Sequence, residues 1–437
     1  MSGKLHTLYH LWRMSSASRE ELLAFQWHKL KPILQWAYDN VPYYYGLFTT
    51  AGIHPEDIRS VADLTAIPVS SSQDYRTRPL TEMLARGVNP DRLVRRPTSG
   101  STGKPFVIRR TVMEDHLLNQ FRIRVRHAFG VRPGDRTAAV HFSSGAHSRH
   151  NLAGRIRHLL GIYRHYPVDC LASPDDILDQ IADLQPDSIT GYPAVLAQLA
   201  RRQLEQPRPS LKPRLITTGG EALGPHRRSL IERGFRCPVF DVYGAHEFNL
   251  VAWQCPTGSD LHLCEDNIVV EILKDGRPAA PGESGELVAT GLHSYAMPFI
   301  RYKLGDIVTR GEDACRCGVP FATLRSIEGR RHDYFRLPDG TSFHPDRIVV
   351  PIMEAEAPSF DRWRLLQLKP DQIVLQIQPF RPLSPEQLAR LSAIARQQLP
   401  EAVQFSVEVV ERLEPEPGGK FRFCRSYVEA PANNDNA

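Results

Sequence analysis

The most informative segment of the sequence reads Thr98-Ser99-Gly100-Ser101-Thr102-Gly103-Lys104 and is followed by Pro105. Hydroxyl groups, two glycines and one ammonium suit a loop whose backbone N–H groups and side chains wrap a polyphosphate. A Walker loop, G-x-x-x-x-G-K-[ST], is excluded, because Thr98 replaces its first glycine and Pro105 replaces its Ser or Thr. A serine- and glycine-rich surface turn is the alternative that this segment alone leaves open.

Further motifs follow in a fixed order along the chain. They are Thr217-Thr218-Gly219-Gly220-Glu221, Tyr243-Gly244-Ala245-His246-Glu247, Arg301-Tyr302-Lys303-Leu304-Gly305-Asp306, Ile327-Glu328-Gly329-Arg330-Arg331-His332-Asp333 and Gly418-Gly419-Lys420. Together with the loop at position 98, this order resembles the adenylate-forming enzymes, the acyl-CoA synthetase superfamily. The resemblance is closest to the phenylacetate–CoA ligase branch, including its relatives encoded with capsular-polysaccharide genes, and segments 37–44, 51–53 and 67–68 resemble that branch's N-terminal signature.

Composition narrows the class of protein before any site is considered. A chain of 437 residues with 41% hydrophobic and 24% charged residues indicates a globular protein of two or three domains. The net charge of +5 favours anionic small ligands and is weak evidence for nucleic acid. Seven cysteines, an odd number, argue against a disulfide framework. We expect a cytoplasmic protein with no nucleic-acid partner and no signal peptide or membrane span, because no apolar run approaches about 18 residues.

The pattern of apolar residues predicts α/β layers with a largely parallel sheet between residues 98 and 250. Strands are expected at 137–142, 188–190 and 215–217, and helices at 175–184 and 194–204. Residues 268–273 and 285–290 instead predict antiparallel strands. An amphipathic helix over 19–39 is expected to pack on the protein body, with a membrane-surface helix as the alternative.

The resemblance implies the adenylate-forming enzyme fold. This is a large layered α/β N-terminal domain with a β-rich subdomain, plus a small mobile α+β C-terminal domain. The expected divisions are an AMP-binding domain at 1–329, with a helical segment at 1–70 and the β-rich part at 255–320, a C-terminal domain at 330–429 and a disordered tail at 430–437.

The resemblance also assigns roles to particular residues. Lys104, Glu247 and Lys420 would be catalytic, with Glu247 holding Mg²⁺, a cation that prefers carboxylate and phosphate oxygens. The ATP-contacting residues would be Thr98, Ser99, Gly100, Ser101, Thr102, Gly103, Gly219, Gly220, Glu221, Tyr243, Gly244, His246, Asp306 and Arg330. Asp306 would hold the ribose, and Lys420 would reach the α-phosphate.

Several of these residues can also be explained without a ligand. Glu247 can be a surface glutamate, Asp306 a turn aspartate that caps its own backbone, and Lys420 a solvated lysine. His246 departs from the Thr or Ser usual in the family, so its phosphate contact and a packed histidine stay open. His332 replaces the usual hinge aspartate, which leaves the details of domain rotation open.

Cys255, His262, Cys315 and Cys317 form a second group of candidate ligands. Three thiols and one imidazole complete the tetrahedral set of a structural zinc ion, although the fifty-two residues between His262 and Cys315 exclude a compact zinc finger. A similar set occurs in many members of this branch. Cys264 is a spare candidate ligand or a small buried residue.

The resulting hypothesis is an ATP-dependent, AMP-forming acid–thiol ligase that makes an acyl-adenylate and then a CoA thioester. Its cofactors and partners would be a small carboxylic acid, ATP, CoA, Mg²⁺ and structural Zn²⁺, with a homodimer left open. One alternative passes the acyl group to a sugar, an amine or a carrier protein. A second is a zinc-stabilised binding protein without catalysis. The acid itself is not indicated, because 142–146 and 191–193 suit core packing as well as a pocket.

Overall fold

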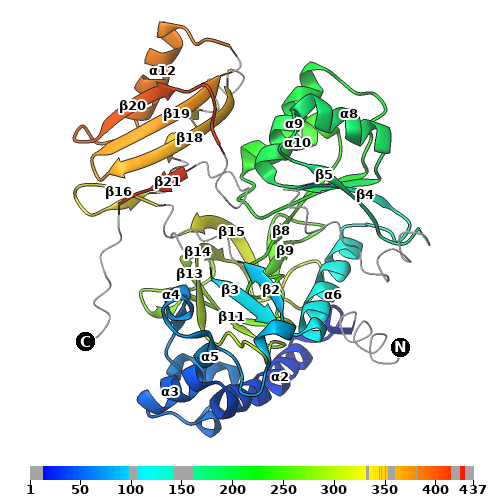
Figure 1. Ribbon diagram of the computed structural model, residues 1–437, viewed down its shortest axis with the longest axis vertical. Helices are drawn as coiled ribbons and strands as arrows, with labels where there is room; N and C mark the ends of the chain where they lie inside the picture. Colours follow the sequence, from blue (N-terminus) through cyan, green and yellow to red (C-terminus); the bar gives the residue numbers. More distant parts are fainter. Residues whose placement is uncertain are drawn as a thin grey trace. The chain divides into compact units, whose positions relative to one another are not determined.

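The computed structural model of the chain describes residues 13–97, 106–141, 161–330, 334–343, 345, 347–349, 351–352, 360–379, 381–414 and 424–428. The chain separates into two compact units, Met1–Ile327 and Glu328–Ala437 (Figure 1). Several expected motifs lie outside the described residues. They are the phosphate loop 98–104, segment 142–146, the hinge positions 331–333 and Lys420.

Helices dominate the first part of unit 1. They are α2 (Arg19–Asn40), α3 (Pro42–Thr50), α4 (Ser72–Thr77) and α5 (Leu80–Met83), with the short 3-10 turns η1 (Pro55–Asp57), η2 (Val61–Ala66) and η3 (Pro90–Arg92). A capping box between Ser18 and Glu21 starts α2, because each side chain satisfies a backbone N–H of the other. The buried face of α2 joins the main core through Leu30, Ile33 and Leu34. The predicted helix over 19–39 is therefore confirmed as a core-packing element. Among the described residues, no helix combines the length and apolarity needed to cross a bilayer.

A parallel sheet forms one half of unit 1. Its strands are β4 (Arg136–His141), β5 (Arg164–Asp169), β6 (Ser188–Gly191), β7 (Leu215–Gly219) and β8 (Val239–Tyr243), in the order β5-β4-β6-β7-β8. Helices α8 (Pro174–Leu184), α9 (Pro193–Glu205) and α10 (Pro225–Phe235) pack together beside these strands (Figure 1). The predicted alternation of strands and helices is confirmed. Because the strands are parallel, their carboxyl ends meet at one edge of the sheet, where open α/β sheets bind ligands.

The sheet continues through β8 into antiparallel strands. They are β9 (Ala252–Gln254), β10 (Leu261–Leu263), β11 (Ile268–Lys274), β12 (Arg277–Pro278), β13 (Ser284–Gly291), β14 (Tyr302–Arg310) and β15 (Thr323–Arg330), and β1 (Ser70–Ser71) adds to β14 in parallel. The sheet has thirteen strands among the described residues. The predicted antiparallel strands are β11 and β13. Sequence reasoning had not indicated that they would belong to the same sheet as the parallel strands.

A separate ladder brackets the phosphate-loop segment. Strand β2 (Val94–Pro97) pairs with β3 (Val107–Arg110), so residues 98–105 connect two paired strands. Helix α6 (Val112–Ala128) follows at once and begins with a capping box between Thr111 and Glu114. This short ladder and its helix set where the chain enters and leaves the loop.

Unit 2 holds a second, smaller sheet. Strands β18 (Phe360–Lys369), β19 (Gln372–Pro379), β20 (Gln404–Val409) and β21 (Cys424–Ser426) lie in the order β20-β19-β18-β21, and α12 (Pro385–Arg396) shares their core. A hairpin of β16 (Phe335–Arg336) and β17 (Ser342–Phe343) completes the unit. The buried amide of Gln367 joins these parts, because its Oε1 accepts from the Arg336 N–H at 2.9 Å and from the Ser426 hydroxyl at 2.8 Å.

Candidate active site and metal centre

Close backbone approach shapes the segments that leave β7 and β8. A Cβ atom at Gly219 would lie 2.8 Å from the Val242 carbonyl oxygen, and one at Gly244 would lie 2.5 Å from the Asn249 carbonyl oxygen. Gly220 has φ +84°, a backbone conformation that side chains disfavour. Packing and backbone conformation therefore favour glycine at these positions, and their predicted contact with ATP stays a prediction. Glu221 is already engaged, because its Oε2 accepts the Ala194 N–H at 3.2 Å in the first turn of α9.

Two tyrosine–carboxylate pairs connect the segment 243–247 with β14. The Tyr302 hydroxyl donates to Glu247 Oε1 at 2.8 Å, and the Tyr243 hydroxyl donates to Asp306 Oδ2. Each segment thus supplies one tyrosine and one carboxylate to the other. Both carboxylates are buried, with 9% of Glu247 and 7% of Asp306 exposed. A surface glutamate and a turn aspartate are both wrong as descriptions, since Asp306 lies inside β14.

Arg110 holds the backbone of the same segment. Its Nη2 donates to the Glu247 carbonyl oxygen at 2.7 Å and to the carbonyl oxygen of His246. The guanidinium is buried and lies 3.8 Å from Asp115, so its charge is balanced within the fold. Burial lowers the pKa of Arg110 to about 10, which leaves it charged at neutral pH. Arg110 ends β3, just after the phosphate-loop segment, and so links that ladder to the Glu247 segment.

His246 and Arg301 belong to the same two motifs and lie in different environments. His246 is exposed, so the packed-histidine alternative is wrong, and its predicted phosphate contact stays a prediction. Arg301 stands at φ +44° and forms a bidentate pair with Glu271 at 2.9 and 2.8 Å. The guanidinium also donates to the Thr65 carbonyl oxygen at 3.0 Å. Arg301 therefore secures β14 rather than facing a ligand.

Several predicted site residues cannot be placed in this geometry. Those outside the described residues are Thr98, Ser99, Gly100, Ser101, Thr102, Gly103, Lys104 and Lys420. Arg330 ends β15, and its side chain lies outside the described part of the chain. Sequence reasoning missed Arg110 altogether and treated Tyr302 only as motif context. The sequence signal that could have indicated Arg110 is its position at the end of the short strand Val107–Arg110.

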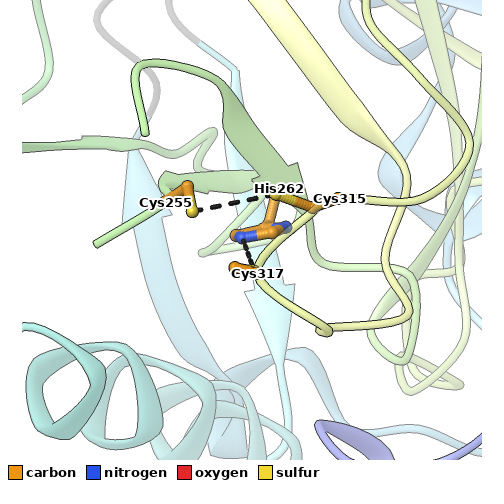
Figure 2. A group of neighbouring side chains, drawn as sticks. All are labelled: Cys255, His262, Cys315 and Cys317. Atoms are coloured by element: carbon orange, nitrogen blue, oxygen red, sulfur yellow. Dashed lines mark hydrogen bonds between the residues drawn. The ribbon is translucent and has the colours of Figure 1, made fainter. Parts of the chain in front are cut away.

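The four predicted metal ligands come together in unit 1 (Figure 2). Cys255 follows β9, His262 lies in β10, and Cys315 and Cys317 lie between β14 and β15. Their ligand atoms all lie within 4.8 Å of one another. The expectation that these distant cysteines and the histidine would meet is confirmed.

Two distances between donor atoms match the edges of a zinc tetrahedron. The Sγ atoms of Cys255 and Cys315 are 3.8 Å apart, and Cys317 Sγ is 3.4 Å from His262 Nε2. Zn–S bonds of ~2.3 Å and a Zn–N bond of ~2.0 Å give tetrahedral edges of about 3.8 and 3.5 Å. Burial lowers the pKa of His262, which favours the neutral imidazole that a metal requires. Among the described residues, this is the one cluster that offers such a donor set.

Cys264 belongs to a different environment. Its Sγ accepts from Arg124 Nη2 at 3.4 Å, and Arg124 pairs with the buried Asp266. The rings of Trp253 and Phe321 lie 5.1 and 5.2 Å from the same guanidinium. Cys264 is therefore a buried packing residue, as the second of its two sequence alternatives proposed.

Comparisons with known proteins identify the family of this chain. Residues 69–296 match the family model of the AMP-binding enzymes. The chain is 32% identical over 361 residues to phenylacetate-coenzyme A ligase of Escherichia coli strain K12, covering 78% of each chain. It is 30% identical over 359 residues to that of Pseudomonas putida, covering 78% of this chain and 77% of the relative. Protein CapK of Staphylococcus aureus is 23% identical over 294 residues, covering 63% and 61%.

A solved structure shows the same fold. A 2-hydroxyisobutyryl-CoA ligase in the postadenylation state superposes with a TM-score of 0.74 at 20% identity, covering 91% of this chain and 88% of that chain. The chain belongs to the AMP-binding enzyme family. The resemblance to the adenylate-forming superfamily and its phenylacetate–CoA ligase branch is thus confirmed, together with the predicted fold.

Proposed function

We propose that this protein activates a carboxylic acid with ATP and then forms a CoA thioester. In the first step the carboxylate attacks the α-phosphorus, which forms an acyl-adenylate and expels pyrophosphate. In the second step the CoA thiol attacks the acyl carbon, AMP leaves, and the thiol proton passes to solvent. The observation that carries the proposal is the pair of buried carboxylates, Glu247 and Asp306, each held by a tyrosine, with Glu247 shortly after the carboxyl end of β8. Relatives that are phenylacetate-coenzyme A ligases support it.

Glu247 is the residue proposed to hold Mg²⁺. Its donor chemistry fits, because Mg²⁺ is bound through one or two carboxylates and substrate phosphates. Arg110 fixes the backbone of this residue and Tyr302 fixes its side chain, so the carboxylate is set in place before a ligand arrives. The ion would offset the negative charge of the triphosphate when bound.

Asp306 is proposed to accept hydrogen bonds from the ribose hydroxyls, and Lys104 and Lys420 to supply cations to the phosphates. A carboxylate within a strand and buried against Tyr243 suits a ligand contact better than a turn. Two anionic reactants require such charge compensation and alignment. The cluster of Cys255, His262, Cys315 and Cys317 is proposed as a structural zinc site, with no part in the reaction.

A second candidate keeps adenylate formation but transfers the acyl group to a sugar, an amine or a carrier protein. The similarity to Protein CapK favours it. Mass spectrometry of the products, formed with and without CoA, distinguishes this candidate from CoA thioester formation.

ATP–pyrophosphate exchange with a panel of carboxylic acids tests the shared first step. At least one acid should stimulate exchange by the wild-type protein, and Glu247→Gln should abolish most of that stimulation while the protein stays folded. Exchange that no acid stimulates would contradict the proposal and favour a zinc-stabilised, non-catalytic nucleotide-binding protein.

A further inference from the structure

Tyr302 is almost completely enclosed within the candidate site. Only 2% of its surface is exposed, and its ring lies 5.1 Å from the ring of Phe299 and 5.6 Å from that of Tyr75. The ring of Phe248 packs on it from the segment that follows Glu247. The phenol therefore has little freedom to turn, and the direction of its hydroxyl is set by the core.

The strand that carries Tyr302 is fixed as well. Ser70 pairs with Tyr302 in the parallel ladder of β1 and β14, and the neighbouring Arg301 is held by Glu271. The packing around the ring and the pairing of its strand together restrain the position of the hydroxyl. At that position it donates to Glu247 Oε1 at 2.8 Å.

The backbone of Glu247 is restrained independently by Arg110, whose Nη2 donates to its carbonyl oxygen at 2.7 Å. With its main chain fixed, the remaining freedom of Glu247 lies in its side-chain rotamers. The hydrogen bond from Tyr302 favours the rotamer that places Oε1 beside the phenol, and a carboxylate that accepts such a bond keeps the oxygen chemistry that Mg²⁺ prefers. Mg²⁺ needs this restraint more than a larger cation would, because it demands near-ideal octahedral geometry.

We infer that Tyr302 is a positioning residue, which orients the Glu247 carboxylate toward the divalent cation that accompanies the nucleotide. The inference rests on the proposed function, since it takes Glu247 as the ligand. It assigns to Tyr302 an effect on metal-dependent nucleotide binding, and no contact with the nucleotide. Without the phenol, Glu247 would have to give up rotamer freedom each time the metal binds.

The test compares nucleotide binding with and without metal. Calorimetry measures the affinity of full-length protein for α,β-methylene-ATP, an analogue that cannot form the adenylate, in Mg²⁺ and in EDTA. The ratio of the two affinities is the metal enhancement. Tyr302→Phe should reduce this enhancement roughly tenfold, the scale of one hydrogen bond to a charged group. Its affinity in EDTA should equal that of the wild type.

Tyr75→Phe is the matched control. It removes a buried phenol from the same aromatic cluster, but its hydroxyl bonds Tyr44 and the Pro298 carbonyl oxygen instead of Glu247. The control should keep the full enhancement. In a Glu247→Gln background, Tyr302→Phe should have no further effect, because its path to the metal is already lost.

A full metal enhancement in Tyr302→Phe would overturn the inference. An equal loss of nucleotide affinity in Mg²⁺ and in EDTA would also overturn it, because such a loss indicates a structural role. If Tyr302→Phe is not recovered folded, Glu247→Asp replaces it, because the shorter side chain withdraws the carboxylate from the phenol. A metal enhancement that is retained in Glu247→Asp would also overturn the inference. Failure of the proposed function is a separate result: the wild type would show no pyrophosphate exchange with any acid, whatever the binding ratios.

Discussion

Removing one thiol from the Cys/His cluster tests the proposed zinc site most directly. Cys315→Ser deletes a ligand whose Sγ lies 3.8 Å from that of Cys255, and leaves three donors around an incomplete tetrahedron. We expect the purified wild type to carry about one zinc ion per chain. The variant should carry far less than that.

The cluster's connectivity sets the size of the effect. The ion would join the β9–β10 hairpin to the segment between β14 and β15, and so would close a loop of about 50 residues between His262 and Cys315. Cross-linking a loop of that length stabilises a fold by about 4 kcal/mol in the chain-entropy model. An equal share of ~10–16 kcal/mol of zinc binding among four ligands gives about 2.5–4 kcal/mol. For a unit that spans Met1–Ile327, a loss of ~3–4 kcal/mol should lower the melting temperature by roughly 4–6 °C.

Metal analysis by mass spectrometry and thermal unfolding with and without a chelator measure both effects. Cys264→Ser is the control, because Cys264 is fully buried nearby and bonds Arg124 instead of the cluster. The control should lose stability and keep its metal, whereas Cys315→Ser should lose both. A wild-type protein purified without metal, whose melting temperature neither zinc nor a chelator changes, would refute the reasoning.

Three further predictions address the site and the fold. Asp306→Ala should weaken ATP binding by about 3 kcal/mol or more, through the loss of two charge-assisted hydrogen bonds; calorimetry measures this, and normal affinity with a much lower melting temperature would argue for a structural role instead. Lys420→Ala should slow adenylate formation ~10²-fold or more while supplied acyl-adenylate and CoA still give thioester, and equal loss in both half-reactions would contradict this. Burial raises the pKa of the Asp241 carboxyl, although Thr218 donates to it at 2.6 Å and Arg228 opposes the shift. Because its native pKa is raised above the unfolded value of 3.8, this carboxyl stabilises the fold at low pH, and that contribution is lost as the pH rises through the native pKa. Asp241→Asn carries no such charge, so the free energy of unfolding that it gains over the wild type should grow from pH 4 to pH 7. Urea unfolding at several pH values measures this difference.

The predicted parts of the fold are those that local patterns specify. The period of apolar residues indicated α2, α8 and α9 to within one or two residues, and short apolar runs indicated β4, β6 and β7. Three thiols and one imidazole complete the donor set of a structural zinc ion. This chemistry predicted that the four ligands would meet, although fifty-two residues separate His262 from Cys315. The family motifs then indicated Glu247 and Asp306 as site residues.

What the sequence did not reveal are contacts between segments that lie far apart in the chain. The hydrogen bonds of Tyr302 to Glu247 and of Tyr243 to Asp306 join residues 55 and 63 positions apart, and no local pattern specifies which side chains meet. Arg110 was missed for the same reason, since its partners are carbonyl groups 136 and 137 positions away. Carbonyl groups carry no signature in a sequence, so a buried arginine that binds them looks like any basic residue.

The pairing of β1 with β14 also sets the order in which this protein can be completed during synthesis. The Ser70 hydroxyl donates to the Ile300 carbonyl oxygen, 230 positions later, at a distance of 3.0 Å. At roughly 5–20 residues per second, a ribosome needs about 10–50 s to make that interval. Throughout that time β1 lacks its partner strand. Ser70 and the neighbouring Ile67 therefore cannot reach the fully buried state that they have in the folded protein until the end of β14 at Arg310 has left the exit tunnel.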